Sequence, residues 1–198
     1  ARLPEVLSLS EVETLIATAS HIRNKAIIAL LYSSGLRVGE LVKLRAGDIY
    51  MSRMQVYVPQ SKNHRDHWTI LSNRALELLK EYWRSYPVKR NYLFVSLDEP
   101  HEPLKVSGVE IMLRAVGKDA GLSVHPHTLR HSFASHMIEQ GVPINYVQSM
   151  LGHRCLESTQ VYIHISNKTV MGIKSPLDHP QKKKRGRKPK KKDGDSNE

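Results

Sequence analysis

The densest group of polar side chains in the sequence is His127-Thr128-Leu129-Arg130-His131. On a helix, His127 and Arg130 are three residues apart and lie on one face, so both can point at the same anion. A guanidinium is always charged and presents planar N–H donors that match phosphate or carboxylate oxygens. An imidazole donates hydrogen bonds and moves protons near neutral pH. An isolated pair of this kind is more often a helix start with a packed histidine and a surface arginine, so other segments must support it.

Two further segments place polar groups beside glycines. Gly35-Leu36-Arg37-Val38-Gly39-Glu40-Leu41 sets Arg37 next to residues that allow close backbone approach, with Glu40 one turn further on to orient the guanidinium. Leu151-Gly152-His153 places a histidine directly after a predicted helix end, and Tyr162 follows it. Each segment alone also fits an ordinary helix junction or a surface ion pair. Their order and spacing along the chain are the informative feature.

In this order the segments resemble the tyrosine recombinase, or phage-integrase, family, and especially its Xer-like members. The matching segments are GLRVGEL, SKNHRD in a predicted hairpin, HPHTLRHSFASHMIEQG, VQSMLGH and STQVYIHIS, which span Gly35 to Ser166. The resemblance implies site-specific cleavage and rejoining of DNA. It also implies an active site made of Arg37, Lys62, His127, Arg130, His153 and Tyr162.

These residue types suit cleavage of a phosphodiester without a metal. The arginines offset charge on the non-bridging oxygens, and Tyr162, a phenol with an ordinary pKa of about 10, becomes a nucleophile when nearby cations favour its phenolate. His127 can assist Tyr162, and His153 can hold a non-bridging oxygen. Lys62 can protonate the leaving 5′ oxygen. Arg65 shares the loop of Lys62, and Ser61 replaces the glycine that the family usually has before this lysine.

Other polar residues receive supporting or structural assignments. Glu40 and His131 are expected to support the residues that contact the phosphate and not to contact it themselves, with His131 supporting its helix. Cys155 is the single cysteine, which excludes an intrachain disulfide and a multi-cysteine zinc site, and we assign it a structural role. No pair of the eleven histidines has a clear metal-ligand spacing together with a carboxylate as the third ligand. We therefore expect no metal and no cofactor.

The chain is basic both in its body and at its end. Its formal net charge is +11, and residues 182–198 contain nine Lys or Arg against three Asp or Glu. This tail supplies a net charge of +6, so residues 1–181 carry the remaining +5. Neutralising phosphates releases condensed counterions, which favours a nucleic-acid partner. Many soluble proteins carry such a charge for solubility, so charge alone favours this partner only slightly.

The tail contains a short motif with Arg185, Arg187 and Lys188 in the sequence RGRKP. It is similar to an AT-hook core, which inserts arginines into the narrow minor groove of A·T-rich DNA. The motif departs from the usual form, which has proline directly after the second arginine. A nonspecific polybasic arm explains the segment equally well. In either case these residues, together with Arg65, are expected to contact DNA.

Hydrophobic periodicity predicts a mainly α fold with a small antiparallel β-sheet, in the α+β class. Ser10 and Glu13 have the spacing of a capping box. The apolar run Lys25–Ser34 predicts a helix that stops at Gly35. Strands are expected at Met54–Val58, His67–Leu71 and Tyr92–Val95, and further helices from about Arg37, at Asn73–Tyr86, Val106–Ala120 and His127–Gln140, from Pro143 to Leu151, and at Glu157–His164.

The resemblance implies a catalytic domain over residues 1–176, and the composition indicates a basic tail over residues 177–198 that is disordered in isolation. Complete relatives place a core-binding domain before the catalytic one, and we expect that it is absent here. The implied partners are double-stranded DNA and other copies of the chain, which is monomeric without DNA and tetrameric on two DNA sites. No apolar run approaches the roughly twenty residues of a membrane span and no signal peptide is evident. We therefore expect a cytoplasmic, nucleoid-associated protein with no membrane partner.

Two other functions remain open. A type IB topoisomerase uses the same chemistry to relax DNA, and a non-catalytic DNA-binding regulator could retain the same scaffold. The HPHTLRHSFASH and LGH segments favour the recombinase, and the full set of catalytic residue types argues against the regulator. Relaxation of a supercoiled plasmid without paired sites would favour the topoisomerase.

Overall fold

The computed structural model of the chain describes residues 6–59, 66–87, 91–96 and 102–152. Its elements are α1 (Leu9–Thr18), α2 (Ile22–Ser34), α3 (Val38–Leu41), a 3₁₀ turn (Ala46–Asp48), β1 (Ile49–Tyr50), β2 (Gln55–Val58), β3 (His67–Ile70), α4 (Asn73–Ser85), α5 (Val106–Asp119), α6 (Pro126–Glu139) and α7 (Ile144–Leu151). The strands form one antiparallel sheet in the order β1-β2-β3. The predicted mainly α fold with a small antiparallel sheet is therefore confirmed.

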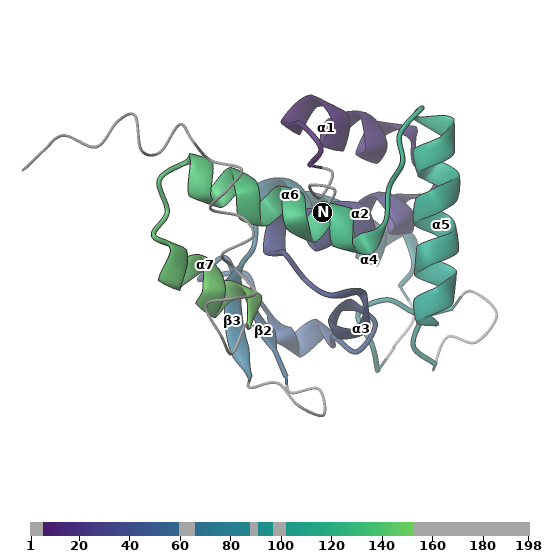
Figure 1. Cartoon of the computed structure of the whole chain (residues 1–198). Helices are drawn as coiled ribbons and strands as arrows, with labels where there is room; N and C mark the ends of the chain where they lie inside the picture. The colour runs from purple at the N-terminus through teal and green to yellow at the C-terminus, as the bar shows by residue number, and fades with distance from the viewer. Residues whose placement is uncertain (1–5, 60–65, 88–90, 97–101, 153–198) are drawn as a thin grey trace, which may run out of the picture.

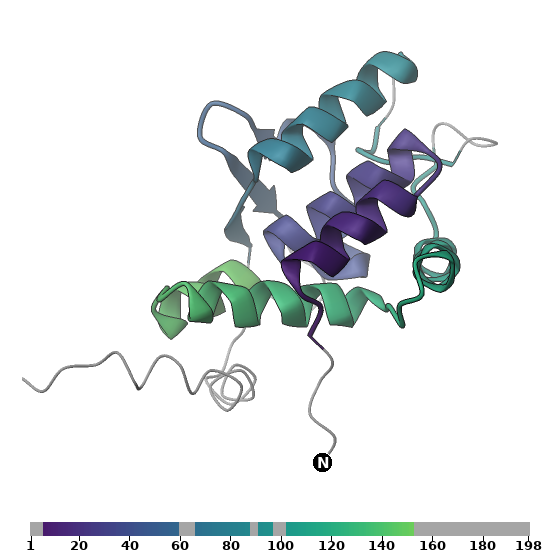
Figure 2. The same ribbon diagram turned by 90° about the horizontal axis from the view of Figure 1, so that it is seen from above.

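Helix α2 lies at the centre of the described structure. Every residue from Ala26 to Leu31 is buried, because this stretch is apolar on all sides of the helix. Helices α1, α4 and α6 pack against it. Figure 1 shows α6 crossing in front of α2. Helix α5 lies near the first residue of α6, and α7 lies near the last residue of α6. Helix α5 stands upright in Figure 1 and is seen end-on in Figure 2, so it runs roughly across the direction of α6.

The sheet is fixed to the end of α2. Val56, Val58 and Thr69 face the core, while Trp68 faces outward, as the alternation of a half-buried sheet requires. The hydroxyl of Thr69 donates to the carbonyl of Ser34 at 2.7 Å. Strands β2 and β3 are paired up to the turn that joins them, so the predicted hairpin is confirmed, while its tip at residues 60–65 lies outside the described residues.

A second apolar cluster joins α6 to α7. It contains Phe133, Ala134, Ile138, Val147 and Leu151. At the edge of this cluster the hydroxyl of Tyr32 on α2 lies 2.8 Å from Nδ1 of His136 on α6, within hydrogen-bond distance. This packing brings the last residue of α7 to the last turn of α2, although more than 110 residues separate them in the chain.

The predicted capping box of the first helix is displaced by two residues. Ser8, not Ser10, is the N-cap: its hydroxyl accepts from the backbone of Glu11 at 3.2 Å, and the carboxylate of Glu11 accepts from the backbone of Ser8 at 2.7 Å. Both serines have a glutamate three residues later, so spacing alone could not choose between them. The position of Leu7 selects Ser8 as the N-cap, because Leu7 is buried and its N–H donates to the hydroxyl of Ser132 on α6 at 2.9 Å.

Two other predicted elements need correction. The strand expected at Tyr92–Val95 is wrong, because only Val95 forms a bridge, and its partner Pro103 has no N–H with which to extend a ladder. Pro143 is the N-cap of α7 and not a residue of its first turn. Strand β1 was not predicted, since two residues are too few to show alternation. The helix expected at Glu157–His164 lies outside the described residues.

We predict that Gly35→Ala destabilises the protein by about 2–4 kcal/mol. Gly35 ends α2 with a φ of +61°, where a side chain is strained. A Cβ there would clash with the ring of Phe133 and lie 2.9 Å from Cδ2 of Leu151. The free energy of unfolding in urea measures the effect. As a matched control, Gly108→Ala on α5 adds a Cβ that meets nothing within 4 Å, so it should leave stability unchanged or raise it.

Candidate active site

Arg37 is held at the junction between α2 and α3 by Glu40. The backbone N–H of Arg37 donates to Oε2 of Glu40 at 2.8 Å, and its Nη1 donates to Oε1 at 2.7 Å. The side chain of Glu40 is 3% exposed and that of Arg37 is 26% exposed. The carboxylate therefore orients the guanidinium from the inside, while part of the arginine remains in contact with solvent.

Arg130 reaches the same place from α6. Its side chain is 4% exposed, and its Nη1 lies 3.8 Å from Oε2 of Glu40. Nη1 also donates to the carbonyl of Gly35 at 2.7 Å, and Nη2 donates to the carbonyl of Leu151 at 2.6 Å. The carbonyl of Leu151 accepts a second, longer bond of 3.4 Å from Nη1 of Arg37. The two arginines thus share one carboxylate and one carbonyl.

Arg37, Glu40 and Arg130 form a cluster with two positive groups and one negative group, hence a net charge of +1. A buried guanidinium is unfavourable unless it is paired and hydrogen-bonded, and both conditions are met for Arg130. The positive charge that the carboxylate leaves uncompensated favours an additional anion beside the cluster. Planar guanidinium groups match the oxygens of a phosphate in particular.

The end of α7 presents the Leu151 carbonyl to this cluster. Helix α7 stops at Gly152, which has a φ of +63°. A Cβ on Gly152 would lie 2.7 Å from Nδ1 of His67, so this close approach to β3 requires glycine. The strand that leaves the hairpin therefore packs directly on the residue that precedes His153 in the sequence.

His127 and His131 lie on the first two turns of α6. His127 is exposed, and its ring centroid is 6.3 Å from that of the half-buried His131. Burial lowers the pKa of His131, and the nearby positive charges of His127 and Arg130 lower it further. The imidazole of His131 is therefore favoured in its neutral form near neutral pH. His127 and Arg130 are one turn apart, but the first faces solvent and the second is buried.

The described structure brings together three of the predicted residues, Arg37, Glu40 and Arg130, with His127 and His131 on the same helix as Arg130. The other predicted site residues lie outside the described residues, namely Lys62, Arg65, His153, Tyr162, Arg185, Arg187 and Lys188. Within the described ranges, no three His, Cys, Asp or Glu side chains are placed to hold a metal ion. In that same part of the chain, no helix has the length and apolar character needed to cross a membrane.

Sequence reasoning missed two components of the cluster, the backbone carbonyls of Gly35 and Leu151. A backbone acceptor has no side-chain signature. The only available signal was the glycine at each helix end, Gly35 itself and Gly152 after Leu151, because left-handed C-caps leave helix carbonyls that need donors.

A model of the "Phage integrase family" matches residues 5–169 of this chain. The chain is 36% identical over 167 residues to "Tyrosine recombinase XerA" of Pyrococcus horikoshii, which covers 84% of this chain and 59% of that relative. The solved structure of a XerA recombinase superposes with a TM-score of 0.78 at 32% identity, over 86% of this chain and 64% of that one.

A structure of "XerH site-specific recombinase bound to palindromic difH substrate" superposes with a TM-score of 0.72. Its identity is 23%, over 85% of this chain and 52% of that one, so it supports the fold alone. The chain spans less than two thirds of the length of each of these three proteins. Since the family match covers most of the residues and the XerA match exceeds 30% identity, the chain belongs to the phage integrase family and is a Xer-like member of it.

Proposed function

We propose that this chain is the catalytic domain of a recombinase that cuts and rejoins DNA at specific sites through a 3′-phosphotyrosyl intermediate. The observation that carries the proposal is the convergence of Arg37 and Arg130 on Glu40 and on the Leu151 carbonyl. Family membership and the likeness to XerA support the class of reaction. This class of reaction acts on DNA, and the net positive charge of the chain suits a double-stranded DNA partner.

In the proposed reaction, the phenolic oxygen of Tyr162 attacks the phosphorus atom of a backbone phosphate. A bond forms between that oxygen and phosphorus while the bond from phosphorus to the 5′ oxygen breaks. Lys62 gives a proton to the departing 5′ oxygen, His127 assists Tyr162 by accepting its phenolic proton, and His153 holds a non-bridging oxygen. The aryl ester keeps the energy of the broken bond, so reversal of the step with a new 5′ hydroxyl reseals the strand without ATP.

The arginines stabilise charge that develops on the non-bridging oxygens. Arg130 is fixed by the carbonyls of Gly35 and Leu151 before any substrate binds, so it needs no rearrangement when that charge appears. Arg37 is partly exposed and held by Glu40, so it can meet a phosphate at the surface. His131, favoured in its neutral form, supports the helix that carries both His127 and Arg130.

In this proposed function, residues 1–176 form the catalytic domain and residues 177–198 form a basic tail. Arg65 in the hairpin, and Arg185, Arg187 and Lys188 in the tail, contact DNA. The protein is monomeric without DNA and forms a tetramer on two DNA sites. It lies in the cytoplasm, in association with the nucleoid. The net positive charge of both segments suits this partner, because each phosphate contact releases counterions.

We predict that Tyr162→Phe abolishes the covalent protein–DNA adduct and leaves DNA affinity nearly unchanged. The substitution removes one oxygen and no charge. A suicide substrate that traps the adduct, analysed on a denaturing gel, measures the first effect, and a binding titration at fixed salt measures the second. An adduct that persists in the mutant and maps to another residue would contradict the assignment of the nucleophile.

We predict that Arg130→Lys slows single-turnover cleavage by two or more decades, roughly 3 kcal/mol, although charge is preserved. One ammonium cannot reproduce the planar fork that bridges the carbonyls of Gly35 and Leu151 while facing Glu40. Arg114→Lys, on the exposed face of α5, is the matched control and should cleave normally. Near-normal cleavage by a folded Arg130→Lys protein, checked by thermal denaturation, would show that Arg130 is not a phosphate clamp.

We predict that Lys62→Ala slows cleavage strongly on ordinary DNA and much less on a substrate with sulfur at the bridging 5′ position. A thiolate leaves without protonation, so the general acid becomes dispensable. The ratio of cleavage rates on the two substrates is the measurement. Equal defects on both would assign Lys62 to binding, and Arg65→Ala tested on the same pair shows which residue of the hairpin acts.

A further inference from the structure

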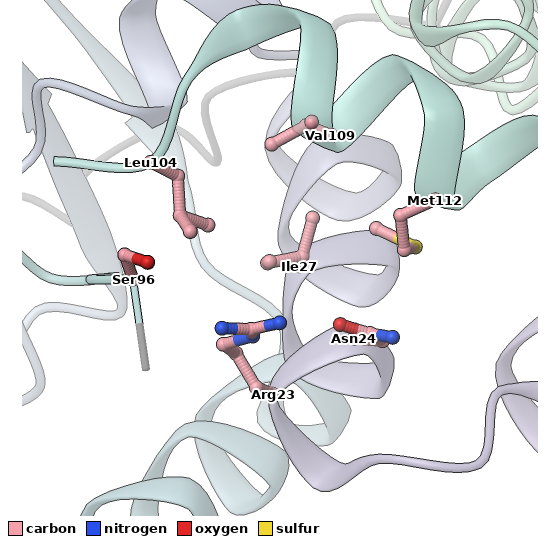
Figure 3. Close-up of a pocket in the computed structure, with 8 residues that line it drawn as sticks. Arg23, Asn24, Ile27, Ser96, Leu104, Val109 and Met112 are labelled. Carbon is pink, nitrogen blue, oxygen red and sulfur yellow. The ribbon is translucent and has the colours of Figure 1, made fainter. Parts of the chain in front are cut away.

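A cavity of about 250 Å³ lies between the first turns of α2 and the first half of α5. Arg23 and Asn24 come from α2, Ser96 from the segment that follows Val95, and Met112 from α5 (Figure 3). Arg23 precedes the end of α2 at Gly35 by twelve residues, which corresponds to about 18 Å along a helix. The cavity therefore lies well apart from the cluster of Arg37, Glu40 and Arg130.

The polar side of the cavity has hydrogen-bonding groups that the described protein does not satisfy. Nη1 of Arg23 donates to the carbonyl of Val95 at 3.3 Å, which orients the guanidinium. Among the described residues, neither the Nε of Arg23 nor the Oδ1 of Asn24 has a hydrogen-bond partner, although both atoms are buried. Asn24 as a whole is only 9% exposed. Figure 3 shows the oxygen of Asn24 on the side that faces Arg23.

Buried polar groups of this kind normally have partners, because leaving one unsatisfied costs about 1–3 kcal/mol. The two atoms need complementary partners: Nε of Arg23 is a donor and requires an acceptor, whereas Oδ1 of Asn24 requires a donor. Arg23 is the only charged side chain among the described lining residues, so an anionic acceptor is favoured. A single group with an acceptor next to a donor would satisfy both.

The opposite side of the cavity is apolar. Ile27, Leu104, Val109 and Met112 line it, as Figure 3 shows. One bridging water would occupy about 30 Å³, so it would fill only a small part of the cavity beside these apolar side chains. Ligand sites for drug-sized molecules are typically about 300–1,000 Å³, so a cavity of this size suits a smaller molecule with a short apolar body.

We propose that this cavity binds a small α-amino or α-hydroxy acid with an apolar side chain. The carboxylate accepts from Nε of Arg23, the neighbouring N–H or O–H donates to Oδ1 of Asn24, and the side chain fills the space beside Ile27 and Val109. The hydroxyl of Ser96 lines the polar side and can donate to the same carboxylate. None of these residues belongs to the proposed catalytic machinery, so the inference stands independently of the proposed function.

Calorimetric titration of the full chain with L-leucine and with 2-hydroxy-4-methylpentanoate tests the proposal. We expect saturable binding of at least one acid at a single site, with a dissociation constant of about 1 mM or lower. Leucinamide lacks the carboxylate, and 4-methylpentanoate lacks the adjacent donor. Each should bind at least about tenfold more weakly than the corresponding complete acid. Flat titrations with both acids would overturn the proposal, and so would equal binding of leucinamide.

Three substitutions locate the site. Arg23→Gln removes the charge, and Asn24→Asp places a competing carboxylate beside Arg23, so both should abolish binding. Gly108→Leu adds a side chain at a lining position where a Cβ meets nothing within 4 Å. It should block the cavity while the thermal midpoint stays level or rises, because leucine favours the helix. This variant keeps the test meaningful if the polar variants fold poorly.

Arg114→Gln, the same change on the exposed face of α5, is the matched control and should bind normally. Binding that survives in both Arg23→Gln and Gly108→Leu would overturn the proposal, since it would come from anion contacts elsewhere on this basic chain. Loss of binding in these two variants with normal binding by Arg114→Gln would support it.

Discussion

The buried carboxylate of Glu40 is the interaction on which the arginine cluster depends. It binds the backbone and guanidinium of Arg37 and lies within 4 Å of Arg130. Without it, the two guanidinium groups would meet at the Leu151 carbonyl and lose the carboxylate that lies within 4 Å of both. Removing one partner from a buried charged pair typically costs about 3–5 kcal/mol, because the remaining charge is left uncompensated. The path of the chain from Gly35 through α3 is therefore constrained by charge as well as by packing.

Backbone carbonyls complete the cluster, and their positions have a common origin. Gly35 is the C-cap of α2 and Leu151 is the last residue of α7. The last carbonyls of a helix lack partners within the helix, and the helix dipole places partial negative charge there. Arg130 donates to both, so one buried cation caps two helices. This explains how the guanidinium of Arg130 can be 4% exposed and close to that of Arg37, with the carboxylate of Glu40 between them.

The sequence predicted the local part of this arrangement. Gly35 as a helix end, and Glu40 one turn beyond Arg37, follow from spacing alone because the partners are neighbours in the chain. The meeting of Arg130 with Arg37 does not follow from periodicity and was expected only from the family resemblance. The hydrogen bond from Arg130 to the carbonyl of Gly35, 95 residues away, was not expected at all. The close approach of Gly152 to His67 was not predictable, because it depends on how α7 packs on β3. The predicted position of the capping box was wrong for a related reason, since the burial of Leu7, not the local spacing, selects Ser8 as the N-cap.

The cluster contains several features that oppose folding: a buried guanidinium, a buried carboxylate and two glycines, which lose more backbone entropy on folding than other residues. They can persist because α2 is surrounded by apolar contacts along most of its length, and burial of its alanine, leucine and isoleucine side chains stabilises the helix. The free-energy cost of burying Arg130 arises during folding and not during binding. Desolvation and orientation of Arg130 are completed when the chain folds, so in the proposed reaction that cost is not repeated when a phosphate binds. Arg37 differs because a quarter of its side chain remains exposed, so in the proposed reaction it must still lose water when it contacts the phosphate. In the proposed reaction the two arginines therefore do not contribute equally: Arg130 sets the electrostatic potential of the site in advance, and Arg37 provides the contact that forms on binding.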